Sequence, residues 1–171
     1  MKISIVAVGI CLLTVAAFGQ SNPKLKELEP FVGTWQCSGT TFASQMGPEH
    51  ATKGNVTGAW ILDGSWVEVR YTETKAPKNP HPYAVRMLLS YDDQPKAFVS
   101  GAVDNMRGYS VEQAPGWAAD KMTFDGMMHA GGAAMKSRDI FTKVGKNEIL
   151  HESELEMNGK WVKLDKESCK R

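Results

Sequence analysis

The chain has 171 residues, of which 42% are hydrophobic and 23% are charged, and its formal net charge at pH 7 is +1. A chain of this length can bury one sizeable core, so we expect a single domain. The near-neutral charge gives no overall attraction to nucleic acid or to an anionic membrane surface, and we expect neither as a partner.

The first 19 residues have the parts of a secretory signal peptide. Lys2 supplies the charged start, residues 3–17 form an apolar run, and small residues at Ala17 and Gly19 fit a cleavage site. A membrane anchor is the alternative, but the run is short for a span and no basic flank follows it. We therefore expect an exported mature domain of residues 20–171, secreted or periplasmic, with no stable membrane insertion after cleavage.

A short amphipathic helix is predicted at the start of this domain. Asn22 and Pro23 fit an N-cap and a first helical position, and Pro30 should break the helix. Three apolar residues recur between them at helical spacing: Leu25, Leu28 and Phe31.

The rest of the chain is a series of short segments separated by turn signals. Apolar residues occupy every second position of several segments, as in a barrel wall with one wet face. Asp125-Gly126 is one of the hairpin signals, and residues 43–53 and 75–82 are expected to form longer loops. About ten strands joined by short loops predict an all-β, closed antiparallel up-and-down barrel. The segments are 34–42, 55–62, 65–74, 83–91, 96–103, 106–112, 119–124, 127–130, 134–144, 148–157 and 161–169.

Two cysteines remain after removal of the leader, which contains Cys11. In an even-numbered meander the first and last strands can pair, which places Cys37 beside Cys169. Each shares its strand parity with a tryptophan, Trp35 or Trp161, so both cysteines could face one side. Exported proteins enter an oxidising compartment, where disulfides form and persist. We therefore predict a bridge across the barrel seam, with two free buried thiols as the alternative.

The entry to the domain resembles a known family. Residues 25–35, Leu-Lys-Glu-Leu-Glu-Pro-Phe-Val-Gly-Thr-Trp, resemble the short helix and Gly-x-Trp that open lipocalin-like proteins. Residues 60–66 and 89–92, with Tyr71 and Phe98, extend the match to a bacterial group of secreted, calycin-type proteins catalogued as a domain of unknown function. The resemblance covers nearly all of the mature chain. It implies a ten-stranded barrel like those of nitrobindin and fatty-acid-binding proteins, and no established reaction.

Gly33 and Trp35 have structural roles in this interpretation. Gly33 relieves crowding between helix and strand, and Trp35 plugs the barrel floor. Lipocalins often stack a basic side chain from the last strand on this tryptophan. Here Lys163 shares the parity of Trp161, and no arginine precedes the terminal Arg171 in that strand, so the resemblance leaves the basic partner open.

Motifs for catalysis are missing from the sequence. It has no Gly-x-Ser-x-Gly, no phosphate loop and no compact metal-binding histidine spacing, so we assign no catalytic residue, metal or cofactor. His151 lies on an otherwise apolar strand face, where it could contact a ligand, bind haem iron or be a satisfied wall residue. Nitrobindin-like proteins bind haem through a histidine close to the C-terminus, and this chain has none after His151, which argues against haem.

Methionine is unusually abundant, with nine residues, and its adaptable side chain suits a lumen that accepts varied apolar ligands. Our hypothesis is an exported barrel that binds a small apolar molecule. The alternatives are a ligand-free barrel that acts through its surface and, less favoured, a haem protein or a hydrolytic enzyme using a lumen acid or histidine. The oligomeric state is left open. The candidate lining residues are Trp60, Trp66, Tyr83, Met87, Tyr109, Phe141 and His151.

Overall fold

The computed structural model describes residues 22–44, 47–76 and 79–171. The expected leader, with Cys11, lies outside the described residues. Within the described part of the chain, no helix has the length and apolar character needed to span a membrane.

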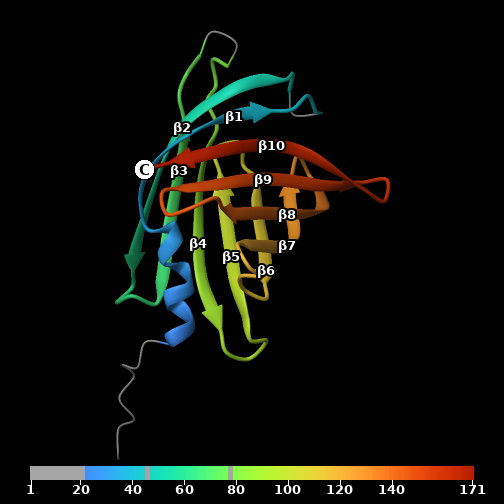
Figure 1. Cartoon of the computed structure of the whole chain (residues 1–171). Helices are drawn as coiled ribbons and strands as arrows, with labels where there is room; N and C mark the ends of the chain where they lie inside the picture. The colour runs from blue at the N-terminus through green and yellow to red at the C-terminus, as the bar shows by residue number, and fades with distance from the viewer. Residues whose placement is uncertain (1–21, 45–46, 77–78) are drawn as a thin grey trace, which may run out of the picture.

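Ten strands form a closed antiparallel barrel, as predicted (Figure 1). Every strand pairs with its neighbours in sequence, and β1 pairs with β10 to close the sheet. The strands are β1 (Gly33–Thr41), β2 (His50–Ile61), β3 (Trp66–Glu73), β4 (Ala84–Asp92), β5 (Ala97–Asp104), β6 (Tyr109–Ala114), β7 (Lys121–Ala130), β8 (Ala133–Lys143), β9 (Glu148–Met157) and β10 (Lys160–Lys170).

The predicted N-terminal helix is a 3-10 helix, η1 (Pro23–Phe31). The Asn22 side chain caps it by accepting a hydrogen bond from the Lys24 backbone N–H at 2.9 Å. Pro30 lies inside the last turn, so the helix ends one residue later than expected. Its apolar face is buried as the spacing predicted: Leu25, Leu28 and Phe31.

The helix η1 packs against β3 and β4 at one end of the barrel (Figure 1). Buried apolar side chains form a core cluster at this end. Phe31 contacts Phe141 edge-to-face, with ring centroids 4.9 Å apart, and stacks on Trp117 at 5.9 Å. The fully or almost fully buried residues of this cluster include Leu28, Val67, Leu89, Phe98, Ala114, Met122 and Phe124. The two longer loops join β1 to β2 and β3 to β4 at the opposite end, as the up-and-down topology requires. The first was expected to reach residue 53, but residues 50–53 belong to β2.

The expected turn at Asp125-Gly126 is wrong, because both residues lie inside the continuous strand β7. Gly126 pairs with Glu112 of β6, and a β-carbon on Gly126 would lie 2.1 Å from the Val111 carbonyl oxygen. Glycine is therefore needed here for close packing. The chain turns instead at residues 131–132, and merging the two expected segments gives the even strand number that closure needs.

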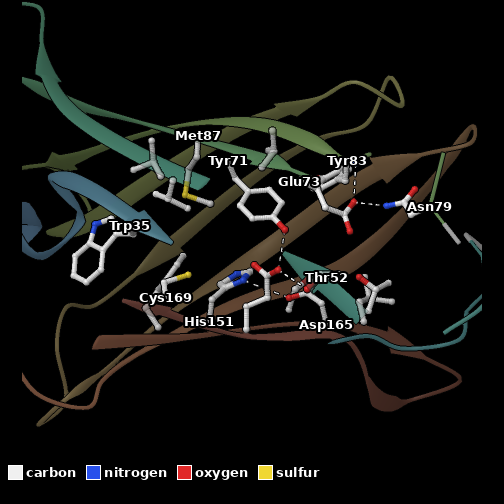
Figure 2. Close-up of a pocket in the computed structure, with 18 of the residues that line it drawn as sticks. Trp35, Thr52, Tyr71, Glu73, Asn79, Tyr83, Met87, His151, Asp165 and Cys169 are labelled. Carbon is white, nitrogen blue, oxygen red and sulfur yellow. Dashed lines mark hydrogen bonds and ion pairs between the residues drawn. The ribbon is translucent and has the colours of Figure 1, made fainter. Parts of the chain in front are cut away.

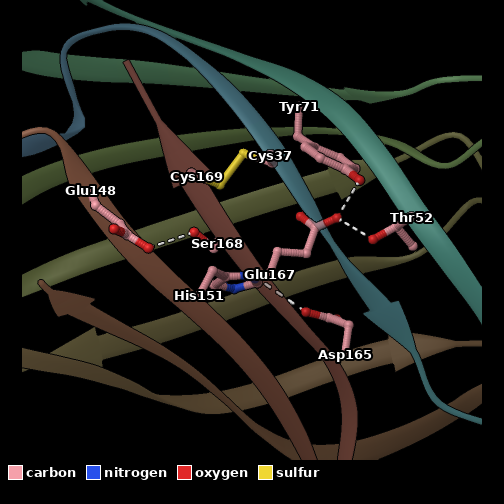
Figure 3. The surroundings of a disulfide bond; sticks show 9 residues. All are labelled: Cys37, Thr52, Tyr71, Glu148, His151, Asp165, Glu167, Ser168 and Cys169. Atoms are coloured by element: carbon pink, nitrogen blue, oxygen red, sulfur yellow. Dashed lines mark hydrogen bonds and ion pairs between the residues drawn. A yellow bond between two sulfur atoms is a disulfide. The ribbon is translucent and has the colours of Figure 1, made fainter.

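The predicted disulfide joins Cys37 to Cys169 across the seam, where the two residues are direct cross-strand partners (Figure 3). The parity argument from Trp161 does not hold, because the register of β10 shifts between Lys163 and Asp165. This bulge reverses the phase of the strand. Trp161 is therefore exposed, with the Arg138 guanidinium 4.2 Å from its ring centre.

Trp35 is only 3% exposed, and the terminal Arg171 covers it. The Arg171 guanidinium carbon lies 4.0 Å from the ring centre, and the same side chain donates a hydrogen bond to the Val32 carbonyl oxygen at 3.2 Å. Arg171 is thus the basic partner that the resemblance left open, while Lys163 pairs with Glu152. Gly33 has a φ of 116°, which favours glycine at this helix-to-strand junction.

Candidate ligand-binding cavity

A cavity of about 290 Å³ occupies the lumen between the packed helix end and the two longer loops. Figure 2 shows Trp35 and Met87 toward one end and Glu73 and Asn79 toward the other, with Tyr71 between them. The main apolar lining residues are Phe31, Trp35, Val56, Val69, Val85, Met87, Met106, Met128, Phe141, Ile149 and Leu164. The main polar ones are Thr41, His50, Thr52, Tyr71, Glu73, Asn79, His81, Tyr83, His151, Ser153, Asp165 and Glu167.

Four of the seven expected lining residues border this cavity: Tyr83, Met87, Phe141 and His151. Alternation along the strands explains their placement. The odd-numbered residues of β4 and β9 face the lumen, as the sequence pattern indicated. The Phe141 and His151 rings are direct cross-strand neighbours, with centroids 4.8 Å apart.

The other three expected residues lie elsewhere. Trp60 shares the inward phase of Val56 but lies beyond the cavity, at the packed end. The expected strand phase is wrong for Trp66 and Tyr109, which lie on outer faces. Trp60 packs at the helix end and donates from Nε1 to the Glu29 carboxylate at 3.2 Å. Trp66 precedes the fully buried Val67 and so takes the outer face of β3. Tyr109 is 48% exposed and stacks on His129 outside the barrel.

Tyr109 was misplaced because β6 reverses the usual rule that the apolar face points inward. Its buried residues include Ser110 and Glu112, whereas Tyr109 and Val111 face solvent. Glu112 can face inward because Ser137 of β8 donates a hydrogen bond to it at 2.5 Å. The alternation of apolar residues in a sequence cannot reveal an inward strand face that is polar.

Glu167 of β10 forms the polar centre of the seam and is only 7% exposed (Figure 3). Its Oε1 accepts hydrogen bonds from Thr52 Oγ1 at 2.6 Å and from Tyr71 Oη at 2.8 Å. Burial and the neighbouring Glu167 charge raise the pKa of Tyr71. The Tyr71 hydroxyl therefore keeps its proton and remains a donor.

His151 lies between two carboxylates. Its Nε2 is 3.1 Å from Asp139 Oδ1 and its Nδ1 is 3.4 Å from Asp165 Oδ1. Burial disfavours the imidazolium, but the contacts with Asp139 and Asp165 outweigh it and raise the pKa of His151 well above its ordinary range. Both ring nitrogens thus face carboxylates, an arrangement that does not present a free nitrogen for iron.

Glu112 lies deeper in the same group. Burial, followed by the charge of Asp139, raises the pKa of Glu112 to about 8. Near neutral pH this carboxyl group therefore holds a proton, which lets it lie close to Asp139 without repulsion.

Glu73 connects the two longer loops at the open end of the cavity. Its Oε2 accepts from Asn79 Nδ2 at 2.5 Å and from the Tyr83 backbone N–H at 2.9 Å, and its Oε1 lies 3.4 Å from His50 Nε2. These contacts bring His50, at the start of β2, against the chain that leads into β4. The polar groups at this end are therefore fixed by a buried carboxylate.

Residues 20–171 match the family described as "Protein of unknown function (DUF1579)". The chain belongs to this family. No curated protein matches the sequence. The comparisons thus give this DUF1579 chain a family but no ligand or reaction.

The sequence reasoning missed the polar members of the cavity in this DUF1579 chain, although one signal for them was present. Asp165 and Glu167 have the same parity as Cys169 and lie beyond the bulge of β10. If Cys169 is predicted to face the lumen at the seam, then alternation predicts that both carboxylates face the lumen as well. Tyr71 and Glu73 follow the same alternation from the buried Val67 in β3.

One group in the described part of the chain has metal-ligand spacing: Cys37, Glu167 and Cys169, whose ligand atoms lie within 4.8 Å of one another. Both sulfur atoms belong to the disulfide. The group therefore cannot provide thiolate ligands while the bridge is intact.

Proposed function

We propose that this chain is an exported, lipocalin-like barrel that binds a small, mostly apolar molecule in its lumen. The observation that carries the proposal is the division of the lumen into a packed end beside η1 and a cavity of about 290 Å³. This volume lies just below the range of about 300–1,000 Å³ found for small-molecule sites, so the cavity suits a small ligand. An apolar wall with a few fixed polar groups is the usual lining of such sites.

The methionines of the lining support a ligand of variable shape. Met87, Met106 and Met128 border the cavity from three different parts of the barrel. Unbranched thioether side chains adapt to irregular ligands at little cost.

Export is supported by two observations that do not depend on the cavity. The family match begins at residue 20, immediately after the expected leader. The second observation is the Cys37–Cys169 disulfide, because disulfides form and persist in oxidising compartments.

The test compares two valine-to-tryptophan variants with the wild type, using N-phenylnaphthylamine fluorescence as the probe of an apolar site. Val85 lines the cavity, whereas Val103 is 59% exposed on the outer face of β5. We expect the wild type and Val103→Trp to bind the probe, and Val85→Trp to bind at least about tenfold more weakly because indole fills the lumen.

Loss of binding in Val103→Trp but not in Val85→Trp would place the probe on the outer surface and contradict the proposal. Native mass spectrometry of protein purified from its host gives an independent readout. A chain that carries no small molecule and does not bind the probe would also sink the proposal.

A ligand-free barrel that acts through its outer surface is the second candidate, favoured by an apolar strip across β5, β6 and β7. Val103 pairs with Tyr109, and Val111 pairs with Met127. All four side chains are exposed, and exposed apolar patches often mark interaction sites. Sedimentation of the wild type and Val111→Lys tests whether copies of the chain associate through this strip. A monomeric wild type would count against such self-association.

A further inference from the structure

The cavity has an excess of negative charge. Among the described residues that line it, Glu73, Asp165 and Glu167 are acidic, and none is lysine or arginine. The histidines of the lining are His50, His81 and His151. Of these, His50 contacts Glu73, and His151 lies between Asp165 and Asp139. The protonated His151 therefore balances only part of the surrounding acid.

Glu167 has one oxygen without a protein donor. Thr52 and Tyr71 both donate to Oε1, whereas Oε2 has no hydrogen bond or ion pair to any residue that the structure describes. The residue is more than nine-tenths buried and borders the cavity. Oε2 is not among the fully buried oxygens that lack a partner, so it is open to the cavity. A cation or N–H donor in the lumen can therefore reach it and form a charge-assisted hydrogen bond.

Asp165 adds a second carboxylate from the same strand. Its Oδ1 is buried and has no hydrogen bond, but it is ion-paired with the His151 ring at 3.4 Å, so Glu167 is the carboxylate with the free oxygen. Two neighbouring inward positions of β10 thus present acceptor oxygens to the lumen.

Aromatic rings stand beside these acceptors. The Tyr71 and Tyr83 ring centroids are 6.5 Å apart, with the planes inclined by 46°. The Tyr71 hydroxyl donates to Glu167, and the Tyr83 hydroxyl lies 3.4 Å from Asp104. Aromatic faces next to carboxylates favour ammonium groups, through the ring quadrupole and through direct charge attraction.

We propose that the ligand of this cavity is an amphipathic amine, with its apolar body toward Met87 and its protonated nitrogen beside Tyr71 and Glu167. The inference rests on the proposed function and narrows its ligand class. A fatty acid would place its carboxylate among three acidic side chains, so the same lumen disfavours it.

Isothermal titration calorimetry at neutral pH with decylamine, decanol and decanoate tests this inference. The three probes share one apolar chain and differ in head-group charge. We expect decylamine to bind the wild type at least about tenfold more tightly than decanol, and decanoate to bind most weakly. Glu167→Gln should weaken decylamine about tenfold and leave decanol unchanged, because the amide keeps the size of the side chain but removes its charge.

Glu148→Gln is the matched control, because Glu148 of β9 contacts Ser168 and Lys170 of β10 on the outer face of the barrel (Figure 3). This variant should bind all three probes like the wild type. Equal affinities for the three probes, or tightest binding of decanoate, would overturn the amine assignment and leave an apolar-binding barrel. If none binds and N-phenylnaphthylamine also fails to bind, the proposed function itself fails. The comparison of the three probes uses only the wild type, so its outcome does not depend on whether a variant folds.

Discussion

Glu167 and Gly39 are direct partners across the β1–β10 seam, and the absence of a side chain on Gly39 leaves room for the glutamate. A β-carbon on Gly39 would lie 2.0 Å from the Lys166 carbonyl oxygen and 2.9 Å from Glu167 Cγ. Glu112 and Gly126 repeat the relationship between β6 and β7, with the same 2.9 Å approach to Glu112 Cγ. Glu167 and Glu112 therefore each lie over a glycine of the neighbouring strand.

This relationship predicts that Gly39→Ala destabilises the barrel. The added methyl group must displace the backbone of β10 or the Glu167 side chain, and overpacking of this kind costs about 1–3 kcal/mol in the free energy of unfolding. Gly101→Ala is the control, since a β-carbon at Gly101 would have no atom within 4 Å. Urea unfolding of both variants should show a loss only for Gly39→Ala. Equal stabilities of the two variants would contradict the steric argument.

The Cys37–Cys169 bridge should contribute strongly to stability, because it links residues separated by 132 positions. Removal of a native disulfide from a small secreted domain costs about 2–5 kcal/mol. We expect the Cys37→Ser/Cys169→Ser variant to unfold at a lower urea concentration than the wild type, and reductant to shift only the wild type. Peptide mapping of the non-reduced exported protein checks the bond itself, and two free thiols there would refute it.

The buried Glu112 and His151 should make the barrel less stable as pH rises toward weakly alkaline values. Between its ordinary pKa of 4.5 and its folded pKa of about 8, Glu112 holds a proton in the native state that the unfolded chain releases. Raising the pH through this window therefore favours unfolding. The raised pKa of His151 acts in the same direction, because its stabilising charge is fully present below 6.5 and is lost as pH rises through the folded pKa.

Urea unfolding at several pH values from about 5 to about 8 measures this effect, and each group contributes a slope of at most about 1.4 kcal/mol per pH unit. Glu112→Gln should flatten the profile, since the amide does not titrate and can still accept from Ser137. Glu156→Gln is the control, because Glu156 pairs with Lys136 on the outer face. A wild-type stability that rises over this pH window would be inconsistent with the buried protonated carboxyl group.

The barrel and its seam could be predicted from the sequence because closure depends on strand number and order, which turn signals and alternation reveal. The bulge at residue 164 could not, since an extra residue in β10 changes the phase without any mark in composition. The Gly126 misassignment has a related cause. Asp-Gly is a turn signal only when no neighbouring strand requires a glycine for close approach, and that requirement is a property of the tertiary structure.

The cavity was only partly predictable for the same physical reason. Met87 follows the apolar alternation of β4 and was found, whereas Glu112 and Glu167 face inward although they are charged residue types. Their burial depends on donors from distant parts of the chain, Ser137 for Glu112 and Tyr71 for Glu167. Hydropathy patterns report the cost of burying such groups but not the partners that offset it.

Arg171 should stabilise the floor of the barrel although it is the last residue of the chain. Its guanidinium lies over the Trp35 ring and also bonds to the Val32 carbonyl group, so it ties the end of β10 to the junction of η1 and β1. We expect Arg171→Ala to lower the free energy of unfolding by about 1 kcal/mol. Arg171→Lys should recover only part of this lost stability, because an ammonium group stacks less well than a planar guanidinium.

Lys160→Ala, at an exposed position at the other end of β10, is the control and should change the free energy of unfolding little in the same urea unfolding experiment. An Arg171→Ala variant as stable as Lys160→Ala would show that Trp35 needs no basic cover.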